Sequence, residues 1–538
     1  MNVDNIKYVS NEILLRITNI LYVIGAIAYI TAKDIAIRKI FNSIFNKFIS
    51  IYLIIFFKYF IYIMIIYDYI IIGSGPAGLT FATLADKNDK IMIIDKDKVI
   101  GGCHKVNRQK YENEYYFSEH GPRIYFSNYL NFKTILNIIG VKFSDIFVKF
   151  NLSFLEILYE TTMKKNVFSM NEIFIMTIDF FKLLGNPNYA KNISMNEYLT
   201  INNFSDKAVN YINRTCRLMD GGDLDKTSLN SFFSVLNDTL LYNGYQPKMP
   251  TDEGLFIVWQ NYLRNVDFKL NTTITDIDNS KSIIKINSAN NDTFYTKKLI
   301  LAIPPINLNE IIKKSSPSIK QLFNNNLDIY SKETAYINNI SITFHWNFKL
   351  NLNKKIYGFH NNTNWGVGAV VLSDYMNFKE KNSKTVISCV ITITDVKSKN
   401  INKTANECTD KKDLIDETFR QLNEVYNNIP VPTLSFINNY YADGEWKSTE
   451  KAFIKATNYN YMNNKISDNI YTLGTHNGNV KYHFTSMETA VANAIVLINQ
   501  LYNKNHYVKR PYTVKDVIII ILLFIVLLMI INLFIFNN

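Results

Sequence analysis

The alternation of apolar runs with glycine-containing turns predicts a strand–helix–strand unit near residue 70. Residues 69–72 are a short run of β-forming residues, typical of a buried strand. Residues 79–85 have a helical pattern, and residues 91–94 form a second apolar run that ends at Asp95. This order predicts a βαβ unit within a parallel sheet.

The turn between the first strand and the helix has the spacing of a dinucleotide-binding loop. Its residues are Gly73, Ser74, Gly75, Pro76, Ala77 and Gly78. The first glycine allows the tight turn, the second lets the backbone approach a pyrophosphate, and the third lets helix and strand pack closely. The helix N-terminus favours the anion. Asp95 follows at the distance where an acid accepts ribose hydroxyl bonds.

Further strands and one capped helix are predicted later in the chain. The expected strands are 267–277, 282–286, 292–296, 298–303, 337–344, 386–394 and 470–473. Residues 173–184 have a helical pattern. Thr485 and Glu488 have the spacing of a capping box before an apolar helix.

Three stretches resemble the flavin amine oxidase and phytoene desaturase superfamily: 66–126, 252–305 and 469–500. Residues 95–102 are similar to its "E-K-x-x-x-x-G-G" pattern, and residues 298–305 to its strand and proline exit turn. Residues 481–491 are close to the "Q-K-Y-x-x-S-M-E-G-A-V" of phytoene desaturases. The chain departs from the family at Cys103, where Arg is usual, and at Ser486, where monoamine oxidases carry Tyr.

The resemblance implies an FAD-dependent oxidoreductase. The residues that it implies for FAD binding are Gly73, Ser74, Gly75, Pro76, Ala77, Gly78, Asp95, Lys96, Gly101, Gly102, Ile274, Gly474, Ser486, Met487 and Glu488. In the family the last helix points at the flavin, where its dipole stabilises negative charge on the reduced ring. The flavin carries the redox step, so no catalytic residue is assigned.

Several histidines and tryptophans leave alternatives open. Residues 119–126 are similar to the "G-P-H-x-F" loop of UDP-galactopyranose mutases, which implies His120 and Arg123 near the flavin; a surface turn with a salt bridge is the alternative. His476 and His483 line the flavin or are structural. Three tryptophans either line an apolar pocket or pack in a core, and we favour the core: Trp346, Trp365 and Trp446.

The expected fold is α/β, with a Rossmann-like FAD-binding domain of the glutathione-reductase type interleaved with an α+β substrate domain, plus a C-terminal transmembrane helix. The expected FAD-binding parts are 64–126, 251–305 and 461–505. The expected substrate-domain parts are 127–250, mainly helical, and 306–460.

Both ends of the chain are apolar. Residues 517–536 are interrupted only by Asn532, and twenty helical residues span a bilayer core of about 30 Å. Lysines and an arginine precede this segment, which predicts a tail anchor with the enzyme domain in the cytosol. Residues 1–63 form an apolar extension: it holds membrane segments at 17–32 and 49–66, or it precedes a true start at Met64.

The charge and the cysteine content of the chain exclude some classes of function. The net charge is +12, from 58 basic and 46 acidic residues, but the lysines are scattered, so we expect a solvated surface and no nucleic-acid partner. The four cysteines include no C-x-x-C pair, so no metal is expected. We expect a small-molecule or lipid-like substrate. The alternatives are a non-oxidative flavoenzyme resembling UDP-galactopyranose mutase and an FAD-free prenyl-binding scaffold resembling GDP-dissociation inhibitors.

Overall fold

The computed structural model divides the chain into two units, residues 1–65 and 66–538. It describes residues 65–150, 154–219, 222–323, 327–328, 331, 335–336, 339–352, 356–357, 363–450, 453–454, 462–478 and 486–536. The predictions for residues 1–63 and for His483 therefore lie outside the described residues.

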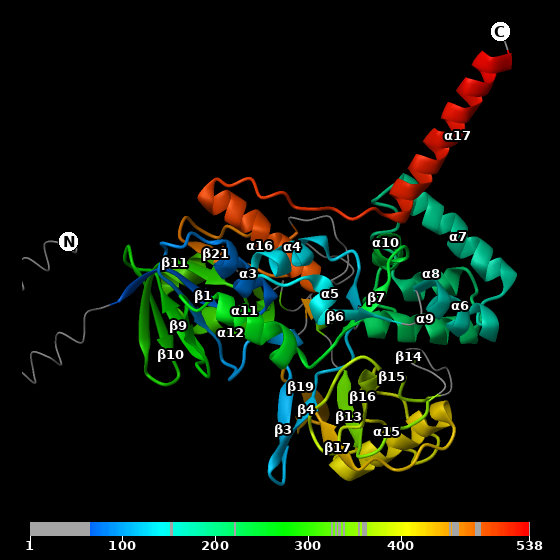
Figure 1. The fold of residues 1–538 in the computed structure, drawn as a ribbon, viewed down its shortest axis with the longest axis horizontal. Helices are drawn as coiled ribbons and strands as arrows, with labels where there is room; N and C mark the ends of the chain where they lie inside the picture. Colours follow the sequence, from blue (N-terminus) through cyan, green and yellow to red (C-terminus); the bar gives the residue numbers. More distant parts are fainter. Residues whose placement is uncertain are drawn as a thin grey trace, which may run out of the picture. The chain divides into compact units, whose positions relative to one another are not determined.

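A seven-stranded sheet forms the centre of the second unit (Figure 1). Its main path is β8 (Asp267–Lys269), β2 (Ile91–Ile94), β1 (Ile66–Ile72), β11 (Thr293–Leu301), β10 (Ile284–Ser288) and β9 (Ile274–Asp278), and β21 (Ile470–Thr472) also pairs with β11. β8, β2, β1, β11 and β21 run parallel, whereas β9 and β10 add an antiparallel edge. Segments far apart in the sequence thus share one sheet.

Helices cover both faces of this sheet, because its strands are apolar on both sides. On one face, α3 (Pro76–Leu84), α16 (Met487–Tyr502), α4 (Leu130–Ile138) and α11 (Ile257–Tyr262) share a core with β1 and β2. On the other face, α12 (Pro305–Lys314) and α13 (Pro317–Phe323) pack against β9 and β11.

Three expected boundaries are wrong. Residues 267–277, expected as one strand, form two strands, β8 and β9, separated by residues 270–273. Residues 293–301 form the single strand β11, although two strands were expected at 292–296 and 298–303. No turn residue separates the two runs, and Lys297, which is exposed and lies with its Nζ 2.8 Å from Asp68 Oδ1, does not end the strand. The helix expected after a cap at Thr485 is α16, and its N-cap is Ser486, whose hydroxyl accepts from Thr489 N at 3.4 Å. A serine one residue nearer the helix takes the capping position.

Residues 154–239 form a helical lobe with its own core (Figure 1). Its helices are α6 (Phe154–Thr161), η2 (Met163–Lys165), α7 (Met170–Gly185), α8 (Met195–Ile201), α9 (Asp206–Met219) and α10 (Leu229–Thr239). Serines begin several of them: the Ser169 hydroxyl accepts from Glu172 N, and Glu172 returns a bond to Ser169 N.

A second, antiparallel sheet contributes the other large layer. Its order is β14 (Ile356–Tyr357), β15 (Val367–Val371), β16 (Thr385–Ile391), β13 (Ile340–Trp346) and β17 (Leu434–Ile437). Helix α15 (Lys411–Tyr426) packs on it. The buried side chains Trp346, Trp365 and Trp446 belong to this core and do not line the cavity described below.

Short elements connect these layers. The strands are β3 (Asn107–Tyr111), β4 (Glu114–Ser118), β5 (Tyr125–Phe126), β6 (Phe147–Lys149), β7 (Gly244–Pro247), β12 (Ala335–Tyr336), β18 (Asn439–Ala442), β19 (Glu445–Ser448) and β20 (Phe453–Ile454). The helical turns are η1 (Gly102–His104), α5 (Phe143–Ile146), η3 (Asp252–Phe256) and η4 (Leu372–Asp374).

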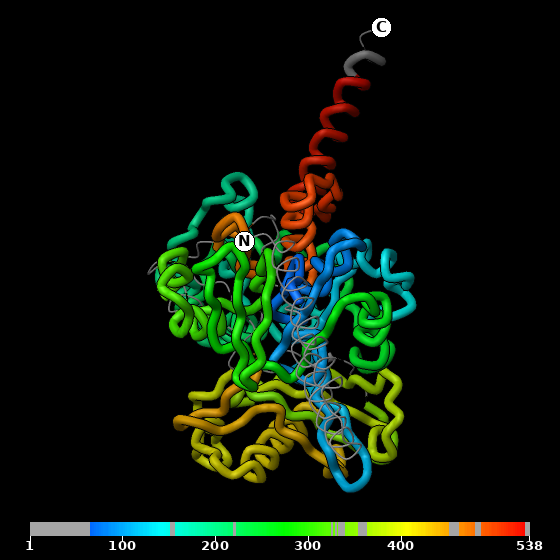
Figure 2. The backbone as a smooth tube through the Cα atoms, turned by 90° about the vertical axis from the view of Figure 1, so that its left-hand side faces the viewer, coloured from blue at the N-terminus to red at the C-terminus, as the bar shows by residue number. Residues whose placement is uncertain are grey.

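The C-terminal helix α17 (Val514–Phe536) leads away from the rest of the second unit, as the red end of the tube in Figure 2 shows. Over Val514–Asn532 its mean hydropathy is 3.1 and none of it is buried. By length and composition, this helix is able to cross a membrane.

Candidate active site

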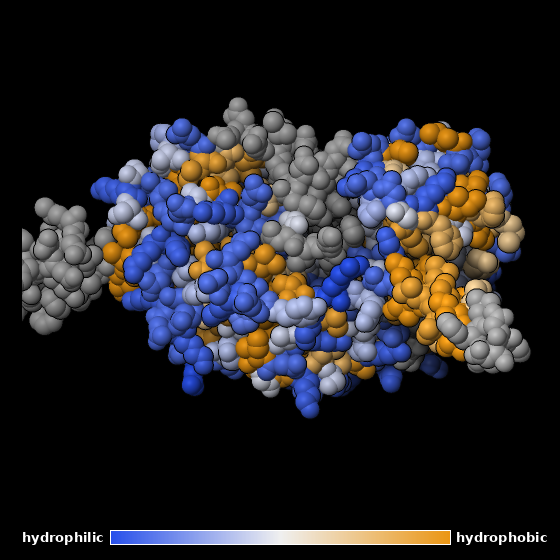
Figure 3. Space-filling view, turned by 90° about the horizontal axis from the view of Figure 1, so that it is seen from above, coloured by the Kyte–Doolittle hydropathy of each residue, from blue (hydrophilic) through white to orange (hydrophobic). Residues whose placement is uncertain are grey.

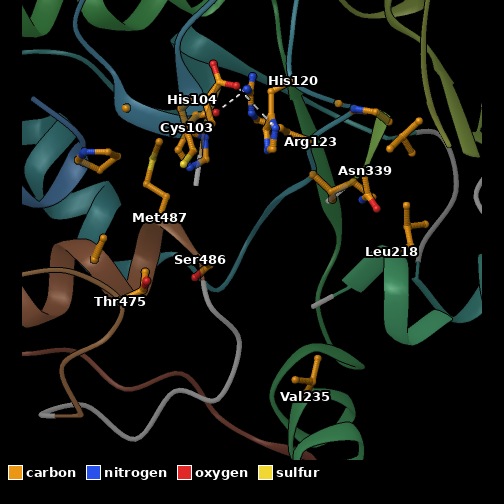
Figure 4. A pocket seen from close by; sticks show the side chains of 18 of the residues that line it. Cys103, His104, His120, Arg123, Leu218, Val235, Asn339, Thr475, Ser486 and Met487 are labelled. Atoms are coloured by element: carbon orange, nitrogen blue, oxygen red, sulfur yellow. Dashed lines mark hydrogen bonds and ion pairs between the residues drawn. The ribbon is translucent and has the colours of Figure 1, made fainter. Parts of the chain in front are cut away.

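One cavity of about 980 Å³ joins the main sheet, the second sheet and the helical lobe. The glycine turn after β1 and the end of β2 line one part of it, and helices α6, α7, α9 and α10 line another. In Figure 4, Met487, Ser486 and Thr475 lie on one side, with Leu218 and Val235 of the lobe on the other. The predicted nucleotide loop and the helical lobe therefore border the same space.

The glycines of the turn after β1 have different roles. A Cβ at Gly73, where φ is +109°, would lie 2.3 Å from the carbonyl oxygen of Ala302, and one at Gly78 would lie 2.2 Å from that of Gly73. These two positions require glycine for packing. A Cβ at Gly75 would meet nothing nearer than Gly102 Cα at 3.8 Å, and Gly75 lines the cavity. The backbone at Gly75 is therefore open to a ligand.

Asp95 lies at the cavity edge and is bound to the same turn. Its Oδ2 accepts from Ser74 N and Ser74 Oγ, both at 2.6 Å, and its Oδ1 accepts from Asp97 N at 2.9 Å. Ser74 is buried and does not line the cavity, so its hydroxyl orients Asp95. Sequence spacing predicted Asp95 but gave no indication of this bond.

Some of the expected cofactor-binding residues line the cavity, and the rest do not. Those that line the cavity are Gly73, Gly75, Pro76, Ala77, Asp95, Lys96, Gly102, Ile274, Gly474, Ser486 and Met487. Those that do not line it are Ser74, Gly78, Gly101 and Glu488. Gly101 has φ +121°, and a Cβ there would lie 2.6 Å from the Phe256 ring, so glycine serves the turn at this position.

Glu488 faces helix α4 rather than the cavity. Its carboxylate accepts from Asn131 N at 2.8 Å, Asn131 Nδ2 at 2.6 Å and Phe132 N at 2.9 Å. It therefore caps α4 and ties it to α16. Any contact of Glu488 with a cofactor would therefore be made by its backbone and not by its carboxylate.

The Glu488 carboxyl gives the stability a pH dependence. Burial raises its pKa from 4.5 to about 7, against the opposing effect of the three N–H donors. The folded protein then holds the Glu488 proton more tightly than the unfolded chain does. The resulting contribution to the free energy of unfolding is complete below pH 4.5 and is lost as the pH rises through 7. We expect thermal stability to fall over this interval and the slope to shrink in Glu488→Gln; an unchanged slope would contradict this assignment.

Four charged or polar side chains that line the cavity form a cluster, which we call the Lys105 cluster: Lys105, Asp97, His120 and Glu450. Lys105 and Glu450 are buried, and Asp97 and His120 are partly buried. Lys105 Nζ lies 2.8 Å from Asp97 Oδ2 and 2.9 Å from Glu450 Oε1. His120 Nδ1 lies 3.3 Å from Ser448 Oγ and 3.9 Å from Glu450 Oε2. Lys105 and Glu450 are 345 residues apart in sequence, so no local pattern predicts their pairing.

The protonation states in this cluster follow from burial and from the lysine charge. Burial raises the pKa of Glu450, but Lys105 outweighs it and the pKa falls to about 2. Burial and the Arg123 charge lower the pKa of His120 to about 4, and burial lowers that of His476 to about 3. At neutral pH the cavity therefore contains neutral imidazoles beside an ionised Lys–Glu pair.

Arg123 also lines the cavity, with both ends of its guanidinium bound. Its Nη1 donates to Glu119 Oε2 at 3.0 Å, and its Nη2 donates to the carbonyl of Cys103. It connects the loop after β4 to the turn that follows Gly102. His120 and Arg123, both expected near the flavin, thus lie on the same cavity wall (Figure 4).

Family models match most of the second unit. The model for an NAD(P)-binding Rossmann-like domain matches residues 71–139, and that for a flavin containing amine oxidoreductase matches residues 186–493. The chain belongs to the flavin-containing amine oxidoreductases. The resemblance inferred from sequence and the Rossmann-like α/β fold are confirmed. This amine oxidoreductase is an FAD-dependent enzyme, which sets aside the FAD-free scaffold.

Solved structures agree with this fold. A putrescine oxidase variant has a TM-score of 0.56 at 10% identity, over 82% of this chain and 100% of that one. A protein from Exiguobacterium sp. 255-15, described as a protoporphyrinogen oxidase, has 0.54 at 13% with the same coverage. Cyclohexylamine oxidase from Brevibacterium oxydans IH-35A has 0.51 at 11%, over 81% and 100%. A search of curated protein sequences gives no match.

Proposed function

We propose that this FAD-dependent oxidoreductase is anchored to a membrane by α17 and oxidises a lipid-like substrate by hydride transfer to the flavin. The observation that carries the proposal is the cavity itself. It is lined by the glycine turn and Asp95 in one part, and by apolar side chains of the helical lobe in another, among them Ile173, Met176 and Leu236. The polar part of the cavity wall suits a polar cofactor, and the apolar part suits an apolar substrate.

The chain offers distinct groups for each part of the cofactor. The open backbone at Gly75 and the N-terminus of α3 suit the pyrophosphate, because no side chain of the described residues caps that helix. Asp95 suits the ribose and Ile274 the adenine. Gly474, Ser486 and Met487 suit the flavin ring, beside the N-terminus of α16. When bound, FAD supplies the hydride acceptor.

The remaining cavity residues bind and orient the substrate and exclude water. Phe180 and Phe233 of the lobe give an apolar wall, and the neutral His120 and His476 offer ring nitrogens without a charge. The Lys105–Glu450 pair adds a fixed dipole beside them. The mutase-like alternative needs arginines on a diphosphate. Among the described cavity residues Arg123 is the only arginine, and Glu119 already binds it.

Anaerobic reduction of the bound flavin tests the substrate class. The full chain in detergent is mixed with isoprenoid and long-chain lipid amines, and separately with short polar amines such as putrescine. We expect the lipophilic compounds to bleach the flavin absorbance. Bleaching by the polar amines alone would overturn the lipid-like substrate, and product formed with no net oxidation would favour the mutase-like alternative.

Replacing Asp95 tests the ribose assignment. We expect Asp95→Ala to weaken FAD binding about 10- to 100-fold, because a charged hydrogen bond contributes about 1.5–3 kcal/mol. Asp95→Asn keeps one acceptor for Ser74 and should lose less. Titration of the stripped protein with FAD measures both. An unchanged dissociation constant in Asp95→Ala would show that the carboxylate does not contact the cofactor.

A further inference from the structure

Helix α7 is apolar on two faces. Its inner face contributes Ile173, Met176 and Phe180 to the cavity wall. Its outer face presents Met170, Phe174, Ile178 and Phe181, which follow one another at spacings of four, four and three residues and so form one stripe. We call these four residues the α7 stripe. Between 39 and 78% of each side chain is exposed in the described part of the chain. A helix at a water-facing surface carries polar residues there.

The α7 stripe belongs to the same body as the base of α17. Ile518, in the first turns of α17, packs against the core of the helical lobe, which also holds Leu183 and Leu184 of α7. Lys515 N donates to Asn237 Oδ1 at 3.0 Å, and Tyr242 Oη donates to the carbonyl of Tyr512 at 2.8 Å. The base of α17 is therefore attached to the lobe at α10 and at the residues that follow it.

Apolar surface gathers on this side of the molecule. Figure 3, seen from above, shows hydrophobic residues around the outgoing α17 and beside it on the lobe. The exposed apolar residues of the lobe include the α7 stripe, Tyr159 and Met163. Apolar helix faces of this kind bury about 5–10 Å into the headgroup region.

The cavity reaches the surface beside the same stripe. Tyr159, Met163 and Thr177 line the cavity and are exposed, and all three belong to α6, its neighbouring turn or α7. The exposed lining residues on the nucleotide side are Lys96, Thr273 and Glu310. Exposed lining residues thus occur at two ends of the cavity: polar ones near the nucleotide loop, and Tyr159 and Met163 near α7.

We propose that the α7 stripe docks into the bilayer that holds α17, and that the opening lined by Tyr159, Met163 and Thr177 admits lipophilic substrate directly from the membrane. This inference rests on the proposed anchor and adds a second membrane contact. The occupant of the stripe is lipid, because the stripe lies on the lobe whose core packs against Ile518 at the base of the apolar helix α17, and because Ile173, Met176 and Thr177 of the same helix line the cavity. Docking places that opening at the level of the acyl chains.

Tryptophan fluorescence of the full chain tests docking. The native tryptophans Trp259, Trp346, Trp365 and Trp446 are fully buried, so they give a steady background. Phe174→Trp adds a reporter on the stripe, and Tyr440→Trp adds an exposed control on β18 in the second half of the chain. Phe181→Trp serves as a second reporter. All variants are placed in vesicles of phosphatidylcholine with and without brominated acyl chains.

We expect brominated lipid to quench the added Phe174→Trp and Phe181→Trp signals roughly twofold and to leave that of Tyr440→Trp unchanged. Equal quenching at all positions, or none at any, would overturn docking. A reporter that is already shielded in detergent and stays unquenched in lipid would also overturn it, because another protein surface would then cover the stripe.

Photolabelling tests entry through the opening near α7. A long-chain alkyl diazirine is dissolved in the vesicles, irradiated with the full chain, and the labels are mapped by mass spectrometry. We expect labels on the cavity residues Ile173 and Met176 as well as on α17. Labels confined to α17 would overturn direct entry. Neither readout needs flavin. If quenching and labelling fail but lipophilic compounds still reduce the flavin, the membrane contact is rejected and the proposed function stands. If labelling succeeds but lipophilic compounds do not reduce the flavin, only the proposed function is rejected.

Discussion

Replacing Gly75 by valine is expected to abolish FAD binding while the protein still folds. Gly75 has φ −72° and ψ 175°, a conformation that any L residue adopts, and its Cβ position is free of close protein contacts. The side chain would instead fill the space next to the α3 N-terminus. Overlap with a pyrophosphate costs more than about 3 kcal/mol, which weakens binding by at least about 100-fold.

Two other glycines provide controls for this experiment. Gly185→Val adds the same side chain in open space at the end of α7 and should keep full flavin content. Gly73→Val should fail to fold, because its Cβ would overlap the Ala302 carbonyl. Flavin per chain and the thermal midpoint are measured together. A folded Gly75→Val protein with full flavin content would refute the proposed pyrophosphate site.

Removing one partner of the buried ion pair is expected to cause a large loss of stability. The side chains of Lys105 and Glu450 are 7 and 2% exposed and lie 2.9 Å apart. Lys105→Met leaves the Glu450 carboxylate without its main cation, and an unpaired buried charge costs about 3–5 kcal/mol. Chemical denaturation of the apoprotein measures the free energy of unfolding.

The double variant Lys105→Met with Glu450→Gln separates pairing from packing. It removes both charges and should recover most of the lost stability, since a buried ion pair contributes little net stabilisation over neutral groups. Lys403→Met, at an exposed pair with Asp413, should change stability by less than about 1 kcal/mol. A Lys105→Met protein as stable as the parent would show that the pair is not formed in solution.

The parts of the site predicted from sequence are those encoded in short contiguous stretches. The glycine turn and Asp95 lie within 23 consecutive residues, so strand, turn and helix periodicity is sufficient to recognise them. Ser486 and Met487 were assigned through the resemblance of residues 481–491 to a phytoene desaturase stretch, whereas the capping pattern pointed to Thr485 instead of Ser486. The family models confirm the family resemblance that was drawn from these stretches.

Interactions between distant segments could not be predicted. Lys105 and Glu450 come from the turn after Gly102 and the end of β19, and only the folded chain brings them together. Glu488 was expected at the cofactor, but its carboxylate caps α4, a contact that depends on how two helices pack. The boundary of β11 was missed because exposed Lys297 interrupts an apolar run without ending the strand.

The helical lobe illustrates the same limit. A helical pattern at residues 173–184 was recognised, and it corresponds to α7. The sequence alone does not distinguish the apolar residues that line a cavity from those that face outward. That distinction needs the packing of α7 within the core of the helical lobe, and it is the basis of the proposed membrane contact.

The visible absorption spectrum of the full chain, purified in detergent, tests the central claim most directly, with the released cofactor identified by mass. We predict a flavin spectrum and FAD at one molecule per chain. A folded protein that is colourless and takes up no added FAD would contradict the account, as would the release of a different cofactor.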